Sequence, residues 1–90
     1  MTGPDRYVRR LDGRPVAAVH YTGENSDVLR AWLGEAYRVT ESPLSLILSR
    51  WQPLDLVAVS ASDWVVDDGE RVYRVPTTAF SDHCRSVPVG

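Results

Sequence analysis

Closely spaced turn signals divide this chain into short segments, and they constrain its fold more than any other feature of the sequence. Asp12-Gly13 and Asp67-Asp68-Gly69 are typical of hairpin turns, and Ser42-Pro43 and Gln52-Pro53 interrupt the apolar runs between them. Strands joined by so few residues pair antiparallel, because a parallel connection needs about a dozen residues or more. The spacing therefore predicts a mostly antiparallel sheet.

The segments between these turns have the composition of strands, rich in Val, Leu and aromatic residues. They are residues 6–11, 15–21, 37–40, 44–51, 54–59, 64–66 and 71–75. Leu44, Leu46 and Leu48 alternate along one segment and are expected to face the same side. Pro15 opens another, at the strand position where a missing N–H costs no ladder bond. We expect a sheet of about five strands.

The clearest helix signal covers residues 26–33. Its apolar side chains recur on one face, as the spacing of Val28, Leu29, Trp32 and Leu33 indicates. Asn25 suits the N-cap, because its side-chain oxygen can accept from unpaired N–H groups of the first turn. Gly34 suits the left-handed conformation in which many helices end.

A short second helix is expected near the C-terminus, over about residues 77–84. Thr77 or Thr78 can cap it, and Phe80 is its expected buried anchor. The predicted fold is therefore α+β, with a mostly antiparallel sheet, one main helix and one short C-terminal helix.

The length of the chain predicts one domain. Ninety residues can fold alone with a modest margin, and we expect residues 1–90 to form a single unit with loose termini at 1–5 and 88–90. Uncharged runs are no longer than a strand, and the first ten residues lack the apolar segment of a signal peptide. We therefore expect no membrane insertion and a cytoplasmic location.

The composition argues against some kinds of ligand and indicates the kind of genome that encodes the chain. The net charge of -2 argues against sequence-independent binding of nucleic acid, which relies on many phosphate contacts. The single cysteine, Cys84, excludes an internal disulfide and a multi-cysteine zinc site. All ten basic residues are arginine and isoleucine occurs once, which is typical of a GC-rich genome such as that of an actinobacterium or its phage.

Two stretches resemble a known family. The first is Val19-His20-Tyr21-Thr22-Gly23-Glu24-Asn25, and the second is Val59-Ser60-Ala61-Ser62-Asp63-Trp64-Val65-Val66 with Gly69-Glu70, Tyr73 and Phe80 after it. Together they are similar to a family of small phage and prophage proteins with an aromatic-Thr-Gly segment and a Pro-Gly-Asp-Tyr/Trp motif. The resemblance covers about residues 14–85 and implies an actinobacteriophage origin. The family has no established common activity, so it implies no catalytic residues.

The chain departs from that family at two positions. Ala61-Ser62 stands where the family has Pro-Gly, and Val75 where it commonly has cysteine. At the shared motif, Asp63 before Trp64 is expected to stabilise a turn by bonding backbone N–H groups two residues on.

Several clusters suggest chemistry, but each has a structural explanation. Asp82-His83-Cys84 could contain a nucleophile and its base, yet adjacent helical residues diverge by about 100° and cannot form a linear triad. His20 and His83 with nearby aspartates lack the spacing of a metal site. Residues 67–70 lack the length of a calcium loop. We expect no enzyme activity and no cofactor or metal.

Arginines gather near the N-terminus at positions 6, 9, 10 and 14. They could form an arm for nucleic acid, but acids are dispersed among them and interleaved aromatic residues are lacking. A solvated hairpin is the favoured interpretation.

The three tryptophans have different expected places. Trp32 belongs to the helix stripe, and Trp64 alternates with Val66 and should pack inside. Trp51, beside Arg50 and before Gln52-Pro53, is the tryptophan most expected on the surface. Because tryptophan and arginine are common interface anchors, Arg50 and Trp51 are candidate protein-interface residues. The alternative is that Trp51 caps the core.

These observations favour a small non-enzymatic phage accessory protein that binds and modulates a host bacterial protein in the host cytoplasm. A homodimer formed through sheet edges is a further option. The alternative function is a module that binds or sequesters a small ligand, such as a nucleotide signal of host defence. That alternative predicts a concave pocket with convergent arginines.

Overall fold

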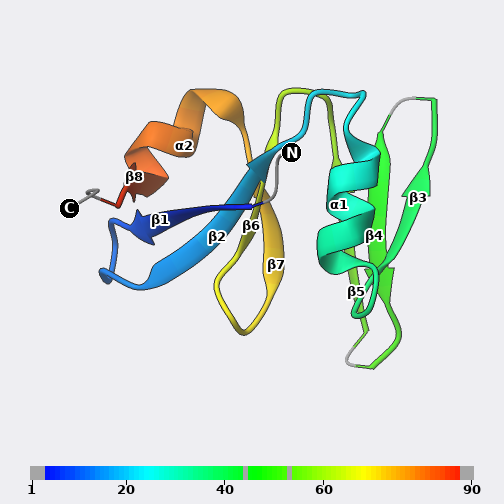
Figure 1. The fold of residues 1–90 in the computed structure, drawn as a ribbon, viewed down its shortest axis with the longest axis horizontal. Coiled ribbons are helices and arrows are strands. Elements are labelled where there is room, and N and C mark those ends of the chain that lie inside the picture. Colours follow the sequence, from blue (N-terminus) through cyan, green and yellow to red (C-terminus); the bar gives the residue numbers. More distant parts are fainter. Residues whose placement is uncertain (1–3, 44, 53, 88–90) are drawn as a thin grey trace.

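A computed structural model describes residues 4–43, 45–52 and 54–87 (Figure 1). Over these residues the fold is α+β, as predicted, with two helices, a main one and a short C-terminal one. In chain order the elements are β1 (Asp5–Arg9), β2 (Pro15–His20), α1 (Ser26–Leu33), β3 (Arg38–Glu41), β4 (Leu46–Arg50), β5 (Asp55–Val59), β6 (Trp64–Asp67), β7 (Val72–Val75), α2 (Thr77–His83) and β8 (Cys84–Ser86).

The described strands form two antiparallel sheets instead of the single sheet that the sequence suggested. One has the order β7-β6-β2-β1-β8 and the other the order β3-β4-β5. β2 pairs directly with β6, with Ala18 opposite Val66, so the chain between them leaves the large sheet and returns to it. That excursion contains α1 and the whole three-stranded sheet, which lie together on one side of the molecule in Figure 1.

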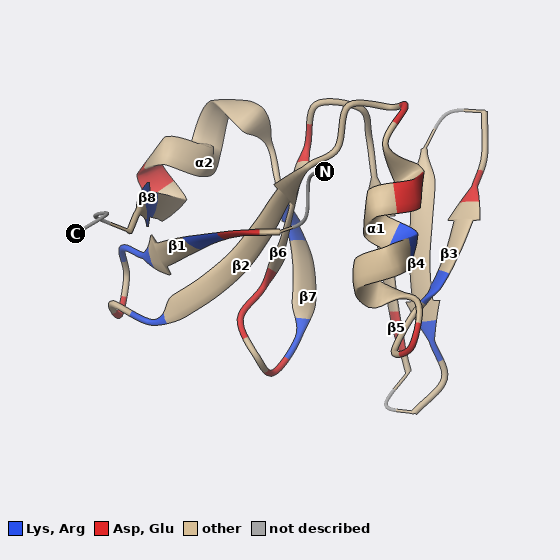
Figure 2. Cartoon of the chain, viewed as in Figure 1, with Lys and Arg blue, Asp and Glu red and all other residues tan. Residues whose placement is uncertain are grey.

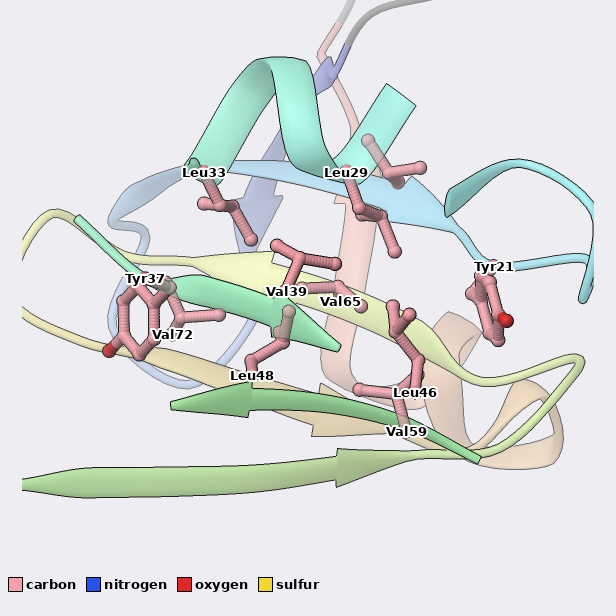
Figure 3. Packing of buried hydrophobic residues seen from close by; sticks show 11 residues of the cluster. Tyr21, Leu29, Leu33, Tyr37, Val39, Leu46, Leu48, Val59, Val65 and Val72 are labelled. Carbon is pink, nitrogen blue, oxygen red and sulfur yellow. The ribbon is translucent and has the colours of Figure 1, made fainter. Parts of the chain in front are cut away.

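Side-chain alternation gives the five-stranded sheet two buried faces. On one face β2 and β6 contribute Val19 and Val65 to the main core, which also takes residues from α1 and the three-stranded sheet (Figure 3). Its buried members are Val19, Tyr21, Leu29, Leu33, Tyr37, Val39, Leu46, Leu48, Val59, Val65 and Val72. On the other face a smaller cluster, the α2 core, consists of Val16, Ala18, Val66, Val75, Phe80 and Cys84.

Helix α1 has the predicted bounds, but its ends differ from the prediction. Asn25 is the N-cap residue, as predicted, but its side chain makes no capping bond to the helix. Its Oδ1 instead accepts from the N–H of Thr22 at 2.8 Å, and its Nδ2 donates to the carbonyl of His20 at 2.8 Å. Asn25 therefore stabilises the loop before the helix, because the loop folds back within reach of its side chain.

Gly34 is not in the left-handed region that we expected. Its φ of -64° is right-handed, and its N–H donates to the carbonyl of Arg30. A Cβ atom at this position would lie 2.4 Å from the Arg30 oxygen. Close approach to the preceding turn, and not a positive φ, therefore explains the glycine.

Helix α2 is one residue shorter than predicted, because Cys84 begins β8. β8 pairs with β1, and this pairing was not anticipated from the sequence. Neither threonine caps the helix, since the N-cap is Pro76 without a side-chain bond. Phe80 is the buried anchor that the sequence predicted.

The structure tests only some of the predictions for the chain ends. β1 begins at Asp5, the last residue of the segment expected to be loose, and Asp5 pairs with Ala18. The predictions for residues 1–3, 44, 53 and 88–90 lie outside the described residues. Within the described ranges, neither helix has the length and apolar character needed to cross a membrane.

Candidate functional site

Large apolar side chains are exposed at and after the turn between β4 and β5. Trp51 is 82% exposed, Leu54 76% and Leu56 68%. Leu56 lies opposite Ser49, whereas its neighbour Val57 lies opposite the buried Leu48. The pleat therefore turns Leu56 to the outer side of the three-stranded sheet. We call Trp51, Leu54 and Leu56 the β4–β5 surface.

A hollow adjoins this surface at Trp51. Its volume is about 610 Å³, and it is bounded by the end of α1, the start of β3 and the end of β4. Three arginines line it, one from each of these elements: Arg30, Arg38 and Arg50. Figure 2 shows basic segments on all three elements on this side of the molecule. We call this hollow the arginine pocket.

Arg50 is held in the pocket wall by an aromatic ring. Its guanidinium carbon lies 4.9 Å from the centre of the Tyr37 ring, within the range of a cation–π contact. The Tyr37 hydroxyl donates to Asp55 Oδ2 at 2.9 Å. Burial, together with this carboxylate, raises the pKa of Tyr37 above its usual value. The tyrosine therefore stays protonated and positions Arg50.

The two residues singled out by the sequence have different environments. Arg50 is half-buried, and its Nε is buried without a hydrogen-bond partner among the described residues. Trp51 is exposed, so it does not cap the core. The interface role of both residues stays a prediction. Arg30 and Arg38 were missed, because nothing in their sequence spacing brings them to Arg50.

The two stretches that resemble the phage family meet at one junction. Tyr21 donates to the Asp63 carbonyl at 2.9 Å, and Ser62 donates to the Tyr21 carbonyl at 2.7 Å. Asp63 Oδ2 accepts from the N–H of Ser60 at 3.0 Å and from Arg74 at 3.3 Å. Asp63 thus stabilises the turn, although through a residue before it and not, as expected, through one two residues on.

Aromatic rings stack beside this junction. The centre of the Trp64 ring lies 3.8 Å from the centre of the Phe80 ring and 4.9 Å from that of His20. The Trp64 ring is nearly parallel to both. His20 Nε2 lies 3.1 Å from the carbonyl oxygen of Ser62, and the Thr77 hydroxyl donates to the same oxygen. These contacts attach α2 to β2 and β6, so they give His20, Trp64 and Phe80 a role in folding.

The Asp82-His83-Cys84 segment does not present a nucleophile to solvent. Cys84 is 2% exposed, and burial raises the pKa of its thiol. His83 Nε2 lies 2.6 Å from the Tyr73 hydroxyl. A buried thiol with a raised pKa carries little thiolate, the reactive form of cysteine.

The N-terminal arginines are largely engaged within the chain. Arg9 donates to Asp12 at 2.8 Å and to Asp68 at 2.9 Å. Arg10 donates to the carbonyl of Ser81 at 2.8 Å. Arg9 and Arg10 therefore connect distant segments of the fold, which the sequence did not reveal.

Asp68 is the centre of one such connection. Its Oδ1 accepts from the N–H groups of Glu70 and Arg71, each at 2.9 Å, within the β6–β7 turn. Burial acts to raise its pKa, but these bonds and Arg9 together lower it. Residues 67–70 thus form the expected hairpin turn, and within the described ranges no three His, Cys, Asp or Glu side chains group as metal ligands.

Comparisons with family models, curated proteins and solved structures found no match. The resemblance to small phage proteins therefore stays a prediction.

Proposed function

We propose that this protein is a non-enzymatic accessory protein that binds a protein partner through the β4–β5 surface. The observation that supports this is the exposure of Trp51, Leu54 and Leu56 at 82%, 76% and 68% on one hairpin. Folding leaves these side chains in water. A partner that covered them would remove apolar surface from water, which contributes about 25 cal/mol of binding free energy per Å². Tryptophan is also among the residues that contribute most to protein interfaces.

The proposal places the partner in a bacterial host. The resemblance to phage proteins and the arginine-only basic composition support a phage gene from a GC-rich host. The protein would then act in the host cytoplasm by covering a functional surface of a host protein. The buried Cys84 and the engaged His83 favour binding over catalysis.

Affinity capture from an actinobacterial lysate tests this proposal with a matched pair of variants. Leu56→Ser removes an exposed leucine from the β4–β5 surface, and Leu11→Ser removes one that is 87% exposed on the β1–β2 hairpin. We expect one host protein to bind wild type and Leu11→Ser. We expect its affinity for purified Leu56→Ser to fall by about tenfold or more.

Two results would count against the proposal. Equal binding by Leu56→Ser and Leu11→Ser would show that the β4–β5 surface is not the interface. Recovery of the protein alone, with a doubled mass in solution that Leu56→Ser abolishes, would show that the surface serves a homodimer. Circular dichroism of each variant confirms that the fold is intact.

A further inference from the structure

We propose that the arginine pocket binds a nucleotide, with its phosphate among Arg30, Arg38 and Arg50 and its base against Trp51. The pocket brings these three guanidinium groups together from α1, β3 and β4 around a hollow of about 610 Å³. The hollow is wide open to solvent, so it offers a ligand a surface to lie on and does not enclose it, although its volume is within the range of about 300–1,000 Å³ of small-molecule sites. The site shares Trp51 with the β4–β5 surface but uses neither Leu54 nor Leu56, and its ligand is a small molecule, so it goes beyond the proposed protein interface.

The three arginines lack acidic partners within the part of the chain that the structure describes. Arg9, Arg14 and Arg74 each form an ion pair with an aspartate or glutamate, but Arg30, Arg38 and Arg50 do not. Arginine binds phosphate through paired N–H donors, and three such groups at one hollow suit a dianionic phosphate.

Two features of the pocket oppose an anion, and neither outweighs the arginines. Glu35 lines the pocket with one negative charge, and the C-terminal end of α1 adds about half a negative charge. Against these stand three full positive charges. The balance of the lining is about one and a half positive charges. The Asp55 carboxylate, behind Tyr37 and opposite Arg50, lowers it to about half a positive charge, which still favours an anion.

Hydrogen bonding points in the same direction. The Nε of Arg50 is buried and has no partner among the described residues. Buried donors are normally satisfied, so folding leaves part of the hydrogen-bonding capacity of Arg50 unused among the described residues. The Arg30 guanidinium is already oriented, since its Nη2 donates to the Val39 carbonyl at 3.2 Å.

Trp51 supplies the second element of nucleotide recognition. It borders the pocket and is 82% exposed, so its ring faces are accessible to a planar base. Stacking on an aromatic ring tolerates every base, because all bases have a π-face. We therefore expect the phosphate to set the affinity and the base to contribute without strong preference.

NMR titration tests the site on the intact chain, with arginine Nε–H and tryptophan indole signals as the readout. The probes are the four common nucleoside monophosphates, adenosine and inorganic phosphate. We expect each nucleotide to shift the signals of Arg38, Arg50 and Trp51, and adenosine and phosphate to bind at least about tenfold more weakly. Arg38→Gln should weaken nucleotide binding by a similar factor, and Glu35→Gln should strengthen it.

Arg85→Gln is the matched control, because Arg85 is an exposed arginine on β8, in the other sheet. Equal weakening by Arg85→Gln and Arg38→Gln would overturn the proposal, as would unchanged signals at millimolar concentrations of all four nucleotides. Phosphate binding as tightly as the nucleotides would overturn the role of Trp51. Leu56→Ser should leave nucleotide binding unchanged, which separates this site from the protein interface.

Discussion

At Ser62 the backbone adopts a conformation that most side chains avoid. Its φ is 80°, and it is the one non-glycine residue with a positive φ among those described. Both of its backbone groups are in use, because its N–H donates to the Tyr21 carbonyl and its own carbonyl accepts from the Thr77 hydroxyl, with His20 Nε2 3.1 Å away. The junction of β2, β6 and α2 therefore holds Ser62 in this conformation.

Ser62→Gly should stabilise the protein by about 0.5–1 kcal/mol, because glycine has no Cβ to clash at positive φ. The backbone bonds of the junction are retained. Urea unfolding measures the change. Ser62→Ala is the control, since it removes the hydroxyl and keeps the clash, and it should give no gain. A glycine variant less stable than the alanine variant would contradict this explanation.

Individual residues were predictable where one neighbour decides their environment. The exposure of Trp51 agrees with its position between Arg50 and the Gln52-Pro53 turn. Asn25 is the N-cap, as predicted, but the predicted side-chain bond was wrong, because the side chain bonds to Thr22 and His20 instead of to the helix. Sequence alone does not indicate which of several nearby donors an amide will bind.

Among the secondary-structure elements, β4 and β5 show how strand pairing decides how much stability a substitution removes. Leu48 on β4 is fully buried in the main core, whereas Leu56 on β5 is 68% exposed. Leu48→Ala should destabilise the protein by about 2–5 kcal/mol, through lost burial and the cavity that remains. Leu56→Ala should change stability by less than about 0.5 kcal/mol. Chemical denaturation compares the two, and similar losses would mean that the register of β5 is wrong.

The Arg9–Asp68 bond joins β1 to the turn between β6 and β7. Asp68 has a lowered pKa, and hydrogen bonding to Arg9 lowers the pKa of Asp12 to about 2. Stability from these carboxylates is fully present above their unfolded pKa of about 3.9. It is lost as the pH falls below that value toward about 2, because protons then bind the unfolded chain first.

We therefore expect the free energy of unfolding to fall between about pH 4 and pH 2. Asp68→Asn should reduce this acid sensitivity, because the amide keeps the turn acceptor and removes the charge that faces Arg9. Urea midpoints at several pH values measure the effect. The same acid slope in wild type and Asp68→Asn would mean that this bond contributes nothing to folding.

The sequence predicted local elements better than distant pairings. Turn residues between β1 and β2 and between β6 and β7 indicate their hairpins directly, and the stripe of α1 gave its bounds. The pairs β2–β6 and β1–β8 join segments far apart in the chain, and no turn residue marks them. The division into two sheets follows from these distant pairs, so it could not be predicted from spacing.

Across the whole molecule, the two sides of the fold differ in how their surfaces are used. On the five-stranded sheet, α2 covers one face through the stacked Trp64 and Phe80, and Arg9 and Asp68 join its strands. The three-stranded sheet has one face on the main core, and its outer side carries Leu56. This contrast supports a binding role for the three-stranded sheet.

The arginine pocket shows why the candidate site was only half predictable. Arg50 and Trp51 are adjacent in the sequence, so their shared surface could be proposed from the chain alone. Arg30 and Arg38 reach the same hollow only because β3, which follows α1, pairs with β4, with Arg38 opposite Ser49. Convergent charge is a property of the folded chain.

Photo-crosslinking tests most directly whether the outer side of the three-stranded sheet binds a protein partner. A photoreactive residue is placed at position 56 and, in a separate protein, at position 11, which is even more exposed, and both proteins are irradiated in host cells. We predict that position 56 gives an adduct with one host protein and that position 11 gives none. Adducts from position 11 alone, or none from position 56 while the folded protein is abundant, would contradict the central claim.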